Sequence, residues 1–167
     1  MFHVAENQPI GSHVGSVSAV DRDETPRDQF IYVIDSPLTS FQIDRQSGLI
    51  TTSKTIDRER QSLYHLKVIA SACGVNETLV KSHQSTAIVT INVNDVNDNR
   101  PLFIFPRPGN DTLRLTVNDS TTYHKPRVSA YDLDRGVNAL VRYSIAAGNG
   151  SHIVRVVHHC QRLRLTL

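Results

Sequence analysis

Short runs in which apolar and polar residues alternate recur along the 167-residue chain. A period of two residues is typical of half-buried β-strands, and no longer window carries the 3.6-residue period of an amphipathic helix. Turn signals such as "DSPLTS", "DRQSG" and "ACGVNE" separate the runs. The alternating runs contain the sets Val17/Ala19, Phe30/Tyr32/Ile34, Tyr64/Leu66/Val68/Ala70 and Ala87/Val89/Ile91/Val93. The pattern therefore predicts an all-β chain, built as a sandwich with a core that includes Phe30, Tyr32, Leu66, Val89 and Ile91.

The sequence repeats itself at a fixed distance. The set Val17, Ala19, Asp21, Asp23, Tyr32 and Ile34 recurs 111 positions later, without a gap, as Val128, Ala130, Asp132, Asp134, Tyr143 and Ile145. Matches at one offset imply two copies of a unit of roughly 100 to 110 residues. We predict a first domain over residues 1–101 and a second over residues 102–167 that is incomplete at its C-terminus. We expect exposed strand edges and low stability in the second domain, unless another chain or further residues cover them.

Composition excludes several classes of partner. The net charge of +2 is small, and the Lys and Arg residues are scattered rather than gathered into a stripe, which argues against nucleic acid as a ligand. No apolar stretch is long enough to span a bilayer. The start "MFHVAEN" lacks the basic and then apolar pattern of a signal peptide. If the protein is secreted or anchored, we therefore expect this chain to be a piece of it.

The cysteines and the glycosylation motifs bear on whether the protein is secreted. Cys73 and Cys160 lack the CxxC spacing, which favours structural or spare thiols over a disulfide or a redox role. N-x-S/T triplets are compatible with a secreted glycoprotein, although each is common by chance. They stand at Asn76, Asn110, Asn118 and Asn149.

An unusual density of oxygen-bearing side chains follows the last alternating run. The stretch "INVNDVNDNRP", Ile91 to Pro101, holds two aspartates and four asparagines. Asp and Asn are poor strand formers, so these residues serve something other than a β-ladder. Further acidic groups stand at other turn signals, namely Glu6, the "DRE" of Asp57 to Glu59, and the pairs Asp21/Asp23 and Asp132/Asp134. Carboxylates mixed with amide and backbone carbonyls are the ligands that Ca²⁺ prefers.

Other kinds of acidic site fit the sequence less well. In an EF-hand register that starts at Asp95, Arg100 stands where the loop needs glycine and Pro106 where it needs glutamate. Zinc would require His and Cys, and "HHC" at His158 to Cys160 lacks a fourth ligand. A DxD transferase would need an α/β sheet and a phosphate loop, and neither is visible. A hydrolase with paired carboxylates would need a pocket and a nucleophile with its base, so we expect no enzymatic activity.

At this point the motifs carry a specific resemblance. In order along the chain, "AEN", "VSAVDRD", "IDRERQSLYHLKVIAS", "AIVTINVNDVNDNRPLF" and "VSAYDLDRGVNALVRYSI" resemble consecutive extracellular cadherin repeats. The resemblance implies tandem seven-stranded Greek-key (immunoglobulin-like) sandwiches, the second truncated, with three Ca²⁺ ions in each linker between repeats. For the central linker it implies side-chain ligands at Glu6, Asp57, Glu59, Asp95, Asn97, Asp98, Asp132 and Asp134, and backbone carbonyl ligands at Val96, Asn99 and Asn138. It also implies that Asp21 and Asp23 form part of an upstream linker site.

The chain departs from the family pattern at a few positions. Thr25 and Arg27 replace the glycine and asparagine that follow the first aspartate pair, and Ala72 replaces an aspartate that closes the third ion site. Val117 stands opposite Glu6 in the second copy. There is no tryptophan, so the strand-swap anchor of classical cadherins is absent from this chain. A protocadherin-like or long atypical cadherin is the better match.

The resemblance and the charges together lead to an expected function. Seven carboxylates at one junction repel, and a like-charge pair about 4 Å apart costs on the order of 4 kcal/mol at an effective dielectric of 20. We expect Ca²⁺ to bind, at about 10⁻⁴ to 10⁻³ M, and to stiffen the linker. The implied function is calcium-dependent cell–cell adhesion by the ectodomain of a single-pass protein of the cell membrane, through homophilic or heterophilic contact with other cadherin ectodomains. The alternative is a structural spacer without an adhesive surface. No small-molecule substrate is expected.

Overall fold

The computed structural model describes residues 1–20, 30–36, 39–73, 79–107, 109, 127–145, 155–159 and 162–166. The chain divides into two compact units, Met1–Val96 and Asn97–Leu167. Every regular element of the described residues is a β-strand, which agrees with the two-residue period of the sequence. The all-β prediction is therefore confirmed.

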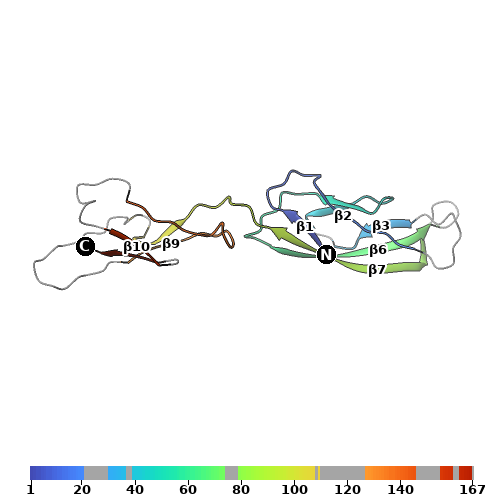
Figure 1. Cartoon of the computed structure of the whole chain (residues 1–167). Coiled ribbons are helices and arrows are strands. Elements are labelled where there is room, and N and C mark those ends of the chain that lie inside the picture. Colours follow the sequence, from blue (N-terminus) through green and yellow to red (C-terminus); the bar gives the residue numbers. More distant parts are fainter. Residues whose placement is uncertain are drawn as a thin grey trace, which may run out of the picture. The chain divides into compact units, whose positions relative to one another are not determined.

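The first unit is a sandwich of two sheets (Figure 1). One sheet has the order β1-β7-β6-β3, with β1 at Phe2–Ala5, β7 at Leu79–Asn94, β6 at Leu63–Cys73 and β3 at Phe30–Ile34. The other has the order β2-β5-β4, with β2 at His13–Ser16, β5 at Leu49–Thr52 and β4 at Phe41–Ile43. Strand β1 pairs with β7 in parallel, and the remaining pairs of this unit are antiparallel. These seven strands match the number expected for the first sandwich.

The core of this unit lies between the two sheets. Ile50 of β5 and Ile91 of β7 are fully buried. Ring stacking adds to the packing, because Phe41 and Tyr64 meet edge to face with centroids 5.1 Å apart. Of the predicted core residues, four are buried and Phe30 is half-buried. The four buried ones are Tyr32, Leu66, Val89 and Ile91. Each fully buried side chain of this size contributes about 1.5–3 kcal/mol.

One predicted strand is shorter than its pattern. The alternation of Val17 and Ala19 predicts a strand, but β2 ends at Ser16 and residues 17–20 are not in a strand. The Val17 N–H still donates to the Gly48 carbonyl at 3.0 Å. Two residues further on, the Ala19 N–H donates to the Tyr32 hydroxyl oxygen at 2.9 Å. A side chain there takes the place that a neighbouring strand's carbonyl would have in a β-ladder.

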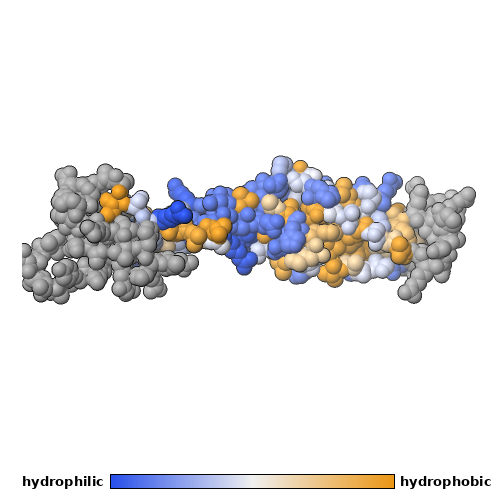
Figure 2. Space-filling model, viewed as in Figure 1, coloured by the Kyte–Doolittle hydropathy of each residue, from blue (hydrophilic) through white to orange (hydrophobic). Residues whose placement is uncertain are grey.

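The outer face of the sheet β1-β7-β6-β3 carries apolar side chains. Val33 is 42 % exposed, Leu63 is 42 % exposed and Ile88 is 63 % exposed. Each is a direct sequence neighbour of a core residue, namely Tyr32, Tyr64 or Val89, so the alternation along a strand places it on the outer face. Figure 2 shows apolar surface on the side of this unit where β6 and β7 run.

The second unit has four strands among its described residues. They form a sheet of order β10-β11-β9-β8, with β10 at Arg155–His159, β11 at Arg162–Thr166, β9 at Arg127–Tyr131 and β8 at Leu102–Phe105. All of its pairs are antiparallel. Strand β8 is exposed at all four positions.

Candidate metal centre

Glu6 follows β1 and joins three segments of the first unit. Its backbone N–H donates to the Asn94 carbonyl at 3.1 Å. Its carboxylate accepts the Arg58 N–H at Oε2, 2.8 Å away, and the Val96 N–H at Oε1, 2.9 Å away. The residue is only 1 % exposed. Because a buried carboxylate needs donors, these two amides hold Glu6 in place and bring the end of β7 against the turn around Arg58.

The "DRE" sequence forms a turn next to Glu6. Asp57 caps its own turn, since its Oδ1 accepts the Arg60 N–H at 3.0 Å and its carbonyl accepts the Gln61 N–H at 3.0 Å. The Arg58 guanidinium forms ion pairs with Glu59 and with Asp95. Its Nε also lies 3.8 Å from the Glu6 Oε1. The Arg58 side chain is 8 % exposed, so one buried cation faces three carboxylates.

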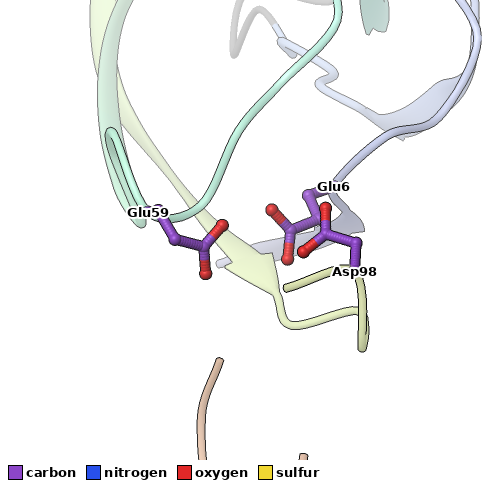
Figure 3. Close-up of side chains that lie close together, drawn as sticks. All are labelled: Glu6, Glu59 and Asp98. Carbon is purple, nitrogen blue, oxygen red and sulfur yellow. The ribbon is translucent and has the colours of Figure 1, made fainter. Parts of the chain in front are cut away.

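The carboxylates of this unit lie close to one another. One Glu59 oxygen lies within 4.8 Å of an oxygen of Glu6, and an oxygen of Glu59 lies within 4.8 Å of one of Asp95. Loss of hydration raises the pKa of Glu59, the nearby Glu6 charge raises it further, and its own N–H and Arg58 act in the opposite direction. Figure 3 shows these glutamates with Asp98. Two peptide units link Asp98 to Val96, which limits their Cα separation to about 7.6 Å.

The second unit contains a smaller polar cluster of its own. Asn99 Nδ2 donates to Asp98 Oδ1 at 2.8 Å and to Asp134 Oδ1 at 2.7 Å. The Asp134 N–H donates to Asp132 Oδ1 at 3.0 Å, so the aspartate pair forms its own turn. Asp134 is 5 % exposed, and within the described residues its buried Oδ2 has no hydrogen-bond donor. A buried carboxylate oxygen in this position is suited to a cation.

The remaining predicted ligands are placed as follows. Asn97 is exposed and Val96 is half-buried. The Asn138 N–H donates to the Arg135 carbonyl at 3.1 Å. Of the departures from the pattern named above, Ala72 lies in β6, in register with Phe30. Outside the described residues lie Cys160, all four glycosylation triplets, and Asp21, Asp23, Thr25, Arg27 and Val117.

The donor set of the described residues fits a calcium ion. It consists of carboxylate oxygens, and it holds no sulfur or imidazole ligand. Acidic clusters of this kind could hold a metal ion. Arg58 is the member that the sequence did not predict, although it stands between two predicted ligands in "DRE". Adjacency in sequence does not reveal which way a long side chain turns.

Comparison with known families decides the relationship. The family model of the Cadherin domain matches residues 1–94. The chain belongs to the cadherin family. It is 40 % identical over 151 residues to "Protocadherin-11 X-linked" of Pan paniscus, and this match covers 89 % of the chain and 11 % of the relative. It is 38 % identical over 150 residues to "Protein dachsous" of Drosophila melanogaster, covering 89 % of the chain and 4 % of that relative.

Solved structures agree with this assignment. The "Protocadherin GammaB4 extracellular domain" superposes with a TM-score of 0.77 at 27 % identity, covering 98 % of the chain and 27 % of that structure. The immunoglobulin-like sandwich expected for cadherin repeats is thus confirmed. This cadherin chain spans about a tenth or less of the length of the curated relatives named above. In the part of the chain that the structure describes, no helix has the length and apolar character to cross a membrane.

Proposed function

We propose that the chain is part of a calcium-dependent adhesive ectodomain on the outer side of the cell membrane. It would bind other cadherin ectodomains, either copies of its own parent protein or related ones. Membership of the cadherin family supports this, and the solved structure that it resembles is an extracellular domain. Anchoring would come from parts of the parent protein beyond this segment.

We further propose that residues 1–101 and 102–167 are two consecutive repeats and that calcium binds at the linker between them. The first repeat would contribute oxygens from three segments, namely the end of β1, the "DRE" turn and the acidic segment after β7. These ligands are Glu6, Asp57, Glu59, Asp95, Val96, Asn97, Asp98 and Asn99. The second repeat would contribute Asp132, Asp134 and Asn138, and Asp21 with Asp23 would serve a linker further upstream.

The convergence of carboxylates within the first unit carries this proposal. Glu6, Glu59 and Asp95 come from three distant parts of the sequence, yet Glu59 has an oxygen within 4.8 Å of each of the other two. Arg58 offsets one of these three negative charges, and the remaining negative charge would be unfavourable without further cations. Bound Ca²⁺ would supply positive charge and shared coordination of these oxygens.

A hydrogen bond within the first unit fixes the start of the acidic segment that is proposed to bind calcium. Glu6 binds the Val96 N–H, so the start of the acidic segment is held at the base of the first unit. Asp98 follows two residues later and is exposed. Without ions, we expect the exposed positions in this segment to leave its peptide bonds accessible to proteases.

Limited proteolysis tests the proposal. The full chain is digested at about 1 mM free calcium and again in excess chelator, with a protease that does not need calcium, and the cleavage sites are mapped by mass spectrometry. We expect calcium to protect the bonds between Val93 and Phe103. The variant Asp98→Ala should lose most of that protection.

Asp35→Ala is the matched control. Asp35 is also an acidic residue, but it forms a surface ion pair with the Lys67 Nζ at 2.6 Å. This variant should keep the protection by calcium. Equal cleavage of the wild-type segment in both conditions would contradict the proposed calcium site.

A second experiment separates adhesion from a spacer role. The intact parent ectodomain is coated on beads, and aggregation is followed with calcium and with chelator. Aggregation that requires calcium supports adhesion between copies. Beads that stay dispersed on their own and aggregate only with beads bearing a related ectodomain support heterophilic adhesion, and dispersed beads in every combination support the spacer.

A further inference from the structure

The Arg58 side chain is buried among three carboxylates. Its guanidinium forms ion pairs with Glu59 and Asp95, and its Nε lies 3.8 Å from Glu6 Oε1. Its backbone N–H also donates to Glu6 Oε2 at 2.8 Å. At 8 % exposure of the side chain, water screens these contacts poorly. The residue is thus joined to the same carboxylates that the proposed calcium site would use.

We propose that Arg58 is an internal counter-cation, which stabilises the calcium-free form of the first unit and thereby opposes calcium binding at the same carboxylates. This inference rests on the proposed calcium site. It assigns to Arg58 a regulatory role that differs from ligation, because a guanidinium has only donors. Arg58 would set how much the unit depends on calcium.

The charge balance explains why Arg58 should stabilise the calcium-free form of the first unit. Glu6, Glu59 and Asp95 together carry three negative charges, and Arg58 is the cation paired with them in the described residues. Planar guanidinium groups suit several carboxylates at once. Replacement of Arg58 by an uncharged residue should therefore leave the carboxylates in strong mutual repulsion whenever calcium is absent.

Competition for the same oxygens explains why Arg58 should oppose calcium binding. Arg58 binds Glu59 Oε1 and approaches Glu6 Oε1, and these are oxygens of residues expected to face the ion. A second cation on the same carboxylates is repelled by the first. By thermodynamic linkage, a group that favours the calcium-free state lowers calcium affinity, and removal of that group raises it.

The test compares Arg58→Met with Arg60→Met in the full chain. Methionine keeps a similar length and removes the charge. Arg60 stands two positions away with an exposed side chain, and it forms no ion pair with the described residues, so it controls for a general loss of positive charge. Thermal unfolding is followed by circular dichroism in chelator and in calcium, and calcium affinity is measured by calorimetry.

For Arg58→Met we expect a lower Tm in chelator, a smaller loss of Tm in calcium, and a Kd for calcium at least about threefold lower than that of the wild type. Arg60→Met should leave the calcium-induced rise in Tm unchanged. An equal loss of Tm in both conditions, or a weaker Kd, would overturn the proposal, because Arg58 would then act only in packing or in holding the ligands.

Two further outcomes are informative. If Arg58→Met does not fold in chelator, Arg58→Lys keeps the charge and should show a calcium-induced rise in Tm close to that of the wild type; a rise well above it overturns the proposal. If the wild type binds no calcium, the proposed function fails for this chain. In that case, calcium binding by Arg58→Met still supports the role of Arg58, and its absence overturns that role too.

Discussion

The backbone N–H of Ala130 donates to the hydroxyl oxygen of Tyr143, 2.8 Å away. The first unit contains the same bond, from the N–H of Ala19 to the Tyr32 hydroxyl at 2.9 Å. Both pairs are 13 residues apart, and the two pairs are separated by the 111-residue offset of the internal repeat. The repeated motif in the sequence therefore encodes a repeated hydrogen bond from a backbone N–H to a tyrosine hydroxyl 13 residues later.

Removal of the tyrosine hydroxyl should weaken each unit separately. Tyr32 is only 6 % exposed, so Tyr32→Phe leaves the Ala19 N–H without its acceptor while the ring stays packed. We expect the free energy of unfolding of the first unit to fall by about 1 kcal/mol, as for a typical hydrogen bond. Urea denaturation measures this. Tyr64→Phe is the control, because the Tyr64 hydroxyl makes no hydrogen bond with the described residues, and an equal loss in both variants would contradict the assignment.

Gly48 should tolerate no side chain. Its φ is +70°, and a Cβ built there would lie 2.3 Å from the Val17 carbonyl oxygen. Gly48→Ala combines left-handed strain of about 1–2 kcal/mol with a backbone clash, so we expect the free energy of unfolding to fall by more than about 2 kcal/mol.

Gly11→Ala provides the matched control for this effect. Gly11 has a φ of +87°, but a Cβ there would have no atom within 4 Å. This variant should show the cost of strain alone. A loss for Gly48→Ala no larger than that for Gly11→Ala, in the same denaturation experiment, would show that the Val17 contact relaxes easily.

Asp44 predicts a dependence of stability on acid. Its Oδ1 accepts the Ser47 N–H at 2.8 Å, the Ser47 hydroxyl at 2.7 Å and the Gln46 N–H at 3.2 Å. These bonds lower the pKa of Asp44 below its ordinary value of 3.8, with the Ser47 N–H as the largest cause. Because the folded pKa lies below the unfolded one, the carboxylate stabilises the turn above pH 3.8, and this contribution is lost as the pH falls through the folded pKa.

Asp44→Asn isolates this contribution. Between neutral pH and strong acid, the difference in Tm between wild type and Asp44→Asn should shrink as the carboxylate becomes protonated. An NMR titration of the Asp44 carboxyl group should give a midpoint below that of a free aspartate. A midpoint at or above the ordinary value would refute the explanation from hydrogen bonds to Ser47 and Gln46.

Much of the fold was predictable because a half-buried strand is marked by local alternation of apolar and polar residues. The alternation around Leu66 and Ile91 identified the inward face, and both residues are buried. Val17 and Ala19 show the limit of that signal. Alternation reports which way a side chain faces, but a strand also needs a partner for its backbone, and at Ala19 that partner is the Tyr32 side chain.

The candidate ligands were chosen from the sequence by chemical type and order along the chain. Glu6, Glu59 and Asp95 were expected at one place, and the first unit does bring these three carboxylates together. The sequence could not show that Glu6 is held by the Val96 and Arg58 amides, because these bonds join residues 90 and 52 positions apart.

The sequence by itself determined the all-β class, the internal repeat and the acidic residues proposed as ligands, because these depend on period, spacing and side-chain chemistry. Only the tertiary structure decided that the Arg58 side chain turns inward between carboxylates and that Glu6 is nearly fully buried. The physical reason is that burial and ion pairing depend on which distant segments pack together. Residues that are neighbours in sequence can point into entirely different surroundings.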